Sequence, residues 1–165
     1  MPPPPLRPAG PDDILDLARL QIASWRAAYA GLIAPATLDG LDFARAAIRW
    51  QRAIDDGLRV LVAAEPALLG FITMEKDEIS MLYVAPDRWR RGIGRRLLQA
   101  ALASLKEQGR GEAGLWVLSG NARARAFYQA EGGRLTASGL VRVGTQELPQ
   151  VRYVWNLAAP TVPEG

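Results

Sequence analysis

The chain has 165 residues, a formal net charge of +3 and 49% hydrophobic residues, which suits one domain with a packed core. It contains no cysteine and no histidine, so disulfides, Cys/His zinc sites, cysteine nucleophiles and histidine-based triads are excluded. An enzyme with this sequence must move protons with Asp, Glu, Tyr, Lys, the chain amine or water. No apolar run approaches the ~20 residues that span a bilayer, and no signal peptide is predicted, so we expect a cytoplasmic location.

One domain is predicted, because no internal repeat and no linker divides the chain. We expect a disordered, proline-rich lead-in at residues 1–5, the domain at 6–158 and a loose tail at 159–165. Hydrophobic periodicity distinguishes helices from strands along the domain. The elements expected in the first half are a strand at 6–8, a helix at 12–29, a helical stretch at 36–54 broken at Gly40, and strands at 59–65, 68–75 and 78–84.

The second half alternates between the two kinds of element. The elements expected there are a helix at 92–108, a strand at 115–118, a helix at 121–131, and a closing hairpin of strands at 135–143 and 151–157. This order predicts an α/β protein with a central mixed sheet. The strand–helix–strand part should be parallel and right-handed.

A basic, glycine-containing loop joins the strand at 78–84 to the helix at 92–108. The first N–H groups of a helix have no partner within it, and glycines such as Gly92 and Gly94 let a large anion approach them. A pyrophosphate is the natural ligand, although an ordinary tight turn with solvated arginines is the alternative. The loop is not a Walker A loop, because no Gly-Lys-Ser/Thr follows, and it is not a dinucleotide fingerprint, because Leu97 stands where the third glycine belongs. The surrounding arginines are Arg88, Arg90, Arg91, Arg95 and Arg96.

A second pattern lies farther along the chain, where Asn121 stands at a predicted helix start and Tyr128 follows seven residues later. Seven residues make about two helical turns, so both side chains point along one face. A helix cap is the simplest role for Asn121, and a core position beside Phe127 is the simplest role for Tyr128.

The two patterns together resemble the GNAT superfamily of acyl-CoA-dependent N-acetyltransferases. Its motif A, Arg/Gln-x-x-Gly-x-Gly/Ala, falls on residues 89–94, where Trp89 departs from the usual Arg or Gln. Its Asn-x-x-Ala-x-x-x-Tyr pattern matches Asn121 to Tyr128, at the usual distance beyond motif A, whereas Gly132-Gly133 departs from the usual Gly-Phe. The resemblance is clearest over residues 70–133. It implies a three-layer fold with a mixed, mostly antiparallel, twisted sheet of six to seven strands flanked by about four helices.

The resemblance also implies roles for particular residues. Tyr128 would lie near the sulfur of acetyl-CoA and protonate the leaving thiolate, and Asn121 would contact the pantetheine or the adenosine-diphosphate arm. The backbone of Leu82, Tyr83 and Val84 would bond the pantetheine. The residues implied to hold the pyrophosphate are Arg90, Arg91, Gly92, Ile93, Gly94 and Arg95.

The predicted function is transfer of an acetyl group from acetyl-CoA to a primary amine of a small molecule or peptide, by direct attack in a ternary complex. The general base is predicted to be Glu78, although a solvated turn carboxylate is an equally open interpretation. The N-terminal helical region and the last hairpin should build the acceptor pocket, with Trp25 and Tyr29 interpreted as core residues. No metal, nucleic acid or membrane partner is expected, and a homodimer is left open. The alternative function is a non-catalytic acetyl-CoA-binding regulatory module, against which the presence of Tyr128 argues.

Overall fold

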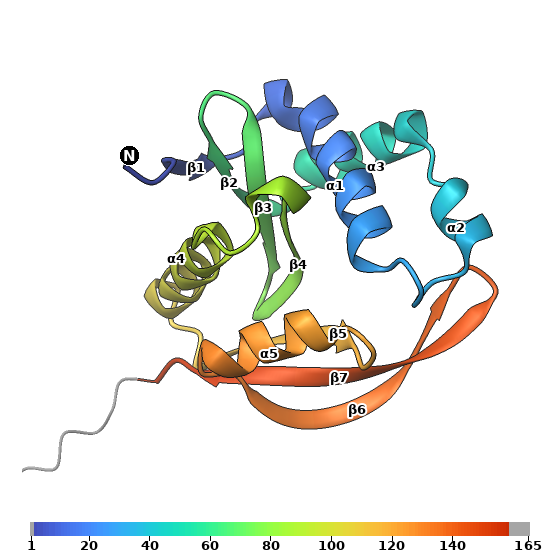
Figure 1. The fold of residues 1–165 in the computed structure, drawn as a ribbon. Helices are drawn as coiled ribbons and strands as arrows, with labels where there is room; N and C mark the ends of the chain where they lie inside the picture. Colours follow the sequence, from blue (N-terminus) through green and yellow to red (C-terminus); the bar gives the residue numbers. More distant parts are fainter. Residues whose placement is uncertain (1, 159–165) are drawn as a thin grey trace, which may run out of the picture.

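The computed structural model describes residues 2–158, and the loose tail expected at 159–165 lies outside them. One seven-stranded sheet, in the order β1-β2-β3-β4-β5-β7-β6, carries helices on both of its faces (Figure 1). The strands are β1 (Leu6–Pro8), β2 (Arg59–Ala64), β3 (Leu68–Glu75), β4 (Glu78–Val84), β5 (Glu112–Leu118), β6 (Arg134–Val143) and β7 (Gln146–Asn156). The α-helices are α1 (Ile14–Ala28), α2 (Pro35–Asp39), α3 (Phe43–Asp55), α4 (Ile93–Glu107) and α5 (Ala122–Ala130).

The predicted α/β fold with a mixed, mostly antiparallel sheet is confirmed. Every neighbouring pair in the sheet is antiparallel except β4 with β5. The second helical stretch divides at the expected place, where Gly40 ends α2 and the Asp42 carboxylate caps α3 by accepting a hydrogen bond from the Arg45 N–H at 2.8 Å. The described residues include no helix with the length and apolarity that a membrane span needs.

Two hydrophobic clusters sandwich the first half of the sheet. On one face α1 and α3 bring Leu17 and Trp50 against Phe71 of β3. On the other face α4 brings Leu97 against the next residue of β3, Ile72. Strand β3 is therefore buried on both sides, which explains why its sequence is almost continuously apolar rather than alternating.

The strands at the end of the chain begin earlier than the sequence predicted. Strand β5 starts at Glu112 rather than at residue 115. Gly114 belongs to its ladder but has no side chain, so the alternation of apolar and polar residues that predicts a strand is not visible there. Strand β7 starts at Gln146 and runs through Pro149, a residue that cannot donate to a ladder but whose carbonyl accepts from the Ser119 N–H at 2.9 Å. Strand β7 also inserts between β5 and β6, an order that hydrophobic periodicity does not reveal.

The sheet opens between β4 and β5. These parallel neighbours are paired only at Glu78 and Gly114, at the beginning of β4, and diverge beyond that point. In Figure 1 the strands β2–β4 consequently run across the direction of β5–β7, with α5 lying over the second group. The divergence leaves a space in the middle of the sheet that side chains of α1, α4 and α5 reach.

The N-terminal segment is held against the domain by its backbone. The Pro4 carbonyl accepts a hydrogen bond from the Arg96 side chain, and the Pro5 carbonyl accepts one from the Ala64 N–H at 3.3 Å. Strand β1 then pairs antiparallel with β2.

Candidate active site

Two cavities occupy the opening between β4 and β5. One has a volume of about 370 Å³ and extends toward the start of α4; the other has a volume of about 320 Å³ and extends toward α1 and the β6–β7 hairpin. They share a wall on which Tyr128 and Arg123 of α5 face Leu82 and Tyr83 of β4. The Tyr128 side chain therefore borders both cavities. We call them the α4 cavity and the hairpin cavity.

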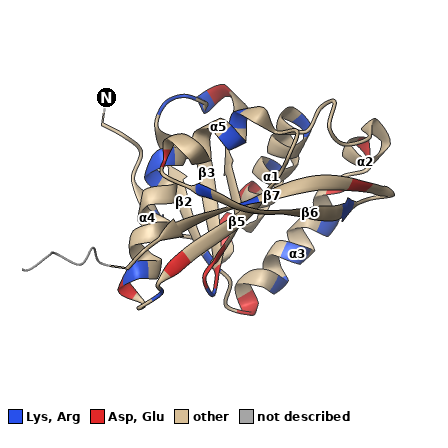
Figure 2. Cartoon of the chain, turned by 90° about the horizontal axis from the view of Figure 1, so that it is seen from below, with Lys and Arg blue, Asp and Glu red and all other residues tan. Residues whose placement is uncertain are grey.

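The start of α4 forms one end of the α4 cavity and has features that suit an anion. Gly92, the N-cap residue, has φ of 79°, a left-handed conformation that glycine adopts without strain, and no side chain caps the first N–H groups. Arg90 also has a positive φ, 63°, which is uncommon for a residue with a Cβ and is found at ligand-binding loops. Figure 2 shows basic segments in this loop and at the start of α5. The uncapped helix start and the positive charge favour a phosphate group.

An aromatic–cation stack spans the wall of the α4 cavity. The indole Nε1 of Trp89 donates a hydrogen bond to the Val84 carbonyl at 2.9 Å, which fixes the ring against the end of β4. The guanidinium carbon of Arg123 lies 3.4 Å from the centre of that ring. Burial lowers the pKa of Arg123 from its ordinary value, although it stays far too high for the guanidinium to lose its charge. The stack ties the loop before α4 to α5.

An ion pair lines the same cavity. The Arg95 Nε atom lies 3.5 Å from a Glu131 carboxylate oxygen. Arg95 is largely exposed, whereas the Glu131 side chain is only 17% exposed, so the pair is anchored on the α5 side.

Tyr128 is the most enclosed ionisable group of the site. Its side chain is 8% exposed and packs against Phe127, Tyr153 and Trp155, with ring centres 5.3 to 6.0 Å apart. Burial raises the pKa of the Tyr128 hydroxyl above its ordinary value, so the phenol keeps its proton across the neutral range. Among the described residues the hydroxyl has no hydrogen-bond partner. Tyr128 can therefore act as a proton donor toward a group in either cavity.

Asn121 begins α5 in the way the sequence predicted. Its side-chain oxygen accepts a hydrogen bond from the Ala124 N–H at 3.2 Å, which satisfies a donor at the helix start. The residue is buried and lines the hairpin cavity rather than the α4 cavity.

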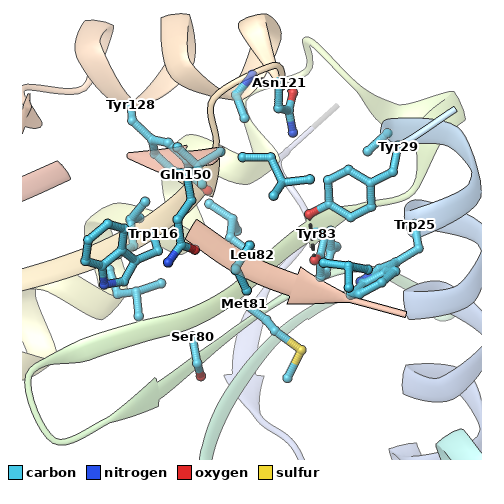
Figure 3. A pocket seen from close by; sticks show the side chains of 18 of the residues that line it. Trp25, Tyr29, Ser80, Met81, Leu82, Tyr83, Trp116, Asn121, Tyr128 and Gln150 are labelled. Atoms are coloured by element: carbon cyan, nitrogen blue, oxygen red, sulfur yellow. Dashed lines mark hydrogen bonds between the residues drawn. The ribbon is translucent and has the colours of Figure 1, made fainter. Parts of the chain in front are cut away.

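The hairpin cavity has apolar and aromatic walls. Figure 3 shows Trp25 of α1 and Tyr29, the residue that follows α1, beside Tyr83 of β4 in the wall of the cavity. The Tyr29 and Tyr83 hydroxyl oxygens are 3.1 Å apart and share a hydrogen bond, and burial raises the pKa of both phenols. Val141 and Gln150 of the β6–β7 hairpin complete the wall opposite α1.

The structure brings together most of the residues that the sequence singled out. Around the α4 cavity lie Leu82, Tyr83, Val84, Arg90, Gly92, Ile93, Gly94, Arg95 and Tyr128. Arg91 belongs to the same loop but does not line the cavity.

Glu78 lies apart from these residues, at the closed end of the opening. Its carboxylate is engaged by the Arg152 guanidinium, with Oε2 accepting from Nη1 at 2.9 Å and a second contact from Nη2 to Oε1. It borders neither cavity. A carboxylate held in a bidentate ion pair and absent from the lining of both cavities is a poor general base, so the geometry disfavours this candidate.

Several site residues were missed or interpreted otherwise from the sequence. Trp25 and Tyr29, interpreted as core residues, line the hairpin cavity. Arg123 was not singled out from the sequence, because a residue two positions after Asn121 does not share its helix face. Within residues 2–158 no three Asp or Glu side chains gather as metal ligands.

Comparison with known proteins identifies relatives over most of the chain. The sequence model described as the acetyltransferase (GNAT) family matches residues 21–132. The uncharacterized N-acetyltransferase YuaI of Bacillus subtilis is 26% identical over 159 residues, which cover 91% of each chain. A GCN5-related N-acetyltransferase from Rhodopseudomonas palustris shares the fold with a TM-score of 0.80 at 24% identity, covering 94% of this chain and 97% of that one. PaiA N-acetyltransferase from Thermoplasma acidophilum, solved in complex with coenzyme A, has a TM-score of 0.70 at 22% identity, with coverages of 88% and 96%.

Proposed function

The chain belongs to the acetyltransferase (GNAT) family, and we propose that it moves an acetyl group from acetyl-CoA to a primary amine by direct attack in a ternary complex. The observation that carries the proposal is the place of Tyr128, on the wall between a cavity with an uncapped helix start and a cavity with apolar walls. Such an arrangement lets two substrates meet at one proton donor. The cytoplasmic location and the homodimer considered from the sequence stay predictions.

The α4 cavity would hold the cofactor. The residues present fit its pyrophosphate, because the N–H groups of Gly94 and Arg95 open an uncapped helix and Gly92 adds no Cβ to block them. Arg90 would add charge, while Arg91 would contribute only at longer range. Strand β4 lacks a ladder partner beyond Glu78 on the side of β5, so the backbone around Leu82 to Val84 can bond the pantetheine as an added strand would.

Acetyl-CoA, when bound, supplies the thioester whose acetyl group is transferred. The amine nitrogen bonds to the acetyl carbon while the carbon–sulfur bond breaks, and the product is an amide. Tyr128 would give its proton to the departing sulfur and recover one from solvent. Its position supports this role because the residue is buried, the phenol is protonated, and no described side chain or backbone group bonds to its hydroxyl.

The attacking amine must first lose a proton. No described Asp or Glu lines the hairpin cavity, and the one carboxylate of the α4 cavity, Glu131, is paired with Arg95. We therefore propose that the proton leaves through water rather than to a carboxylate. Desolvation in the apolar cavity disfavours the ammonium form and lowers the pKa of the bound amine, which assists this step.

Calorimetry with CoA and with pantetheine tests the cofactor half of the proposal. CoA should bind, and pantetheine should bind at least about tenfold more weakly because it lacks the pyrophosphate that the start of α4 would hold. Release of thiol from acetyl-CoA in the presence of a panel of primary amines, with mass detection of the N-acetyl product, tests the transfer. No heat with CoA at about millimolar concentration, together with no acetylated amine, would refute the proposed function.

A further inference from the structure

The hairpin cavity has a lining that discriminates among amines. Arg123 is the only residue of its described lining that carries a formal charge, and the guanidinium of Arg123 is stacked on Trp89 at the side of the α4 cavity. Resting on the acetyl transfer proposed above, we propose that the acceptor is a primary amine carried on an apolar or aromatic body with no second cationic group. Diamines and polyamines are thereby disfavoured.

The size and the walls of the cavity support a small apolar body. Its volume of about 320 Å³ lies at the lower end of the range for small-molecule sites. The side chains of Ile33, Ile79 and Leu115 are buried in its walls. An alkyl chain or an aromatic ring that enters the cavity exchanges water for these surfaces, which favours binding.

The aromatic side chains do not replace a missing carboxylate. Trp25 and Tyr29 are packed edge to face, with ring centres 5.1 Å apart at 89°. The phenols of Tyr29 and Tyr83 bond to each other, and because burial raises the pKa of both they carry no negative charge at neutral pH. Aromatic faces attract cations, but that attraction is smaller than the penalty of burying an ammonium group without a counter-ion.

The polar groups of the lining are neutral. Ser80, Asn121 and Gln150 offer hydroxyl and amide groups, which tolerate an uncharged polar substituent on the acceptor. Figure 3 shows the Gln150 side chain among those that surround the cavity. Glutamate has nearly the shape of glutamine, so this position allows a carboxylate to be introduced with little change of volume.

A matched pair of amines tests the inference. Hexylamine and 1,5-diaminopentane have nearly the same length and differ in whether the far end is a methyl or an ammonium group. The parent protein should acetylate hexylamine with a kcat/KM at least about tenfold higher, because only the diamine buries an unpaired charge. Calorimetry of each amine with the protein–CoA complex should show the same order of affinity.

A matched pair of variants tests whether the preference for hexylamine over the diamine arises in the lining of the hairpin cavity. Gln150→Glu should improve the diamine relative to hexylamine by about tenfold or more, because the new carboxylate pairs with the second ammonium. Gln146→Glu adds the same charge four residues earlier on β7, outside the lining, and should leave the ratio near the parental value.

Equal or better use of the diamine by the parent protein would overturn the inference, as would the same response in both variants or no binding of hexylamine to the CoA complex. In each of these cases CoA would still bind to the protein, so the failure would concern the acceptor alone. Loss of CoA binding itself, with no amine acetylated, would instead overturn the proposed function on which the inference rests.

Discussion

At the scale of single residues, spacing along a helix located the site better than chemical type did. The seven-residue spacing drew attention to Asn121 and Tyr128, and the resemblance to the GNAT pattern implied their roles; in the structure Asn121 caps α5 and Tyr128 lies within it. Glu78 was selected because it is a carboxylate near a turn. Its partner Arg152 is 74 residues away in the sequence, so the ion pair that occupies it could not be predicted from the neighbourhood of Glu78.

Replacing Tyr128 with Phe should separate chemistry from packing. The ring and its contacts stay, but the proton donor is lost, so turnover on a confirmed amine should fall roughly ten- to a thousand-fold. CoA affinity and thermal stability should stay close to the parent, as measured by calorimetry and a melting curve.

Tyr153→Phe serves as the control, because the Tyr153 hydroxyl accepts hydrogen bonds from Arg125 and Gln129, each at 3.2 Å, and borders neither cavity. Its loss should cost about 1 kcal/mol of unfolding free energy and leave turnover unchanged. Parental turnover in Tyr128→Phe would remove Tyr128 from the mechanism and leave water as the donor.

At the scale of elements, most helices and strands were predictable because their apolar residues recur with the right period. Strands β3 and β4 have the predicted bounds, and α4 differs by one residue at each end. The starts of β5 and β7 were predicted too late. Gly114 and Pro149 belong to the ladders, but neither residue type is typical of a strand. The uncapped start of α4 with Gly92 at its N-cap was predictable, since it depends on a helix terminus and on glycines next to it.

Gly94→Ala should weaken cofactor binding without harming the fold. A Cβ at this position would lie 3.6 Å from Phe127 and from Val84, an ordinary contact, and alanine is favoured over glycine in a helix by about 0.5–1 kcal/mol. Stability should therefore hold or rise, whereas the KM for acetyl-CoA should increase at least about threefold, because the new methyl group narrows the cavity at the start of α4.

The matched variant is Gly111→Ala, where a Cβ would meet nothing within 4 Å and the residue borders neither cavity. That variant should keep the parental KM. An unchanged KM in Gly94→Ala would mean that the loop before α4 is only a turn.

At the scale of the whole molecule, the site exists because two strands diverge, and this was not predictable from the sequence. Strands β4 and β5 are each ordinary in composition, and they form the opening only because β5 pairs along its length with β7. The lining of the hairpin cavity is consequently drawn from α1, β4, β5, α5 and the last hairpin. Its lack of carboxylates emerges only when these distant segments are assembled.

The pH dependence of the reaction should reflect the lack of carboxylates in the described lining of the hairpin cavity. The deprotonated form of an alkylamine with a pKa of about 10 becomes more abundant with each unit of pH, so kcat/KM should rise from pH 6 to about 9 without an inflection from a carboxylate. The pKa of Tyr128 is raised above about 10, and the donor therefore stays protonated throughout this range. Two amines with different pKa values should give inflections that shift with the amine. A shared inflection at one pH below the pKa of both would reveal an enzyme base.

The wall between the two cavities has a thermodynamic consequence for how each substrate changes the affinity for the other. Six residues border both spaces: Ala28, Leu82, Tyr83, Arg123, Ala124 and Tyr128. A molecule in one cavity therefore contacts part of the surface that the other molecule will use, and the two binding free energies are coupled. Linkage requires the coupling to be reciprocal, so whatever factor the cofactor applies to acceptor affinity, the acceptor applies to cofactor affinity. Arg123 belongs to this shared wall and is stacked on Trp89 of the α4 cavity, so a change at either residue should alter both affinities together.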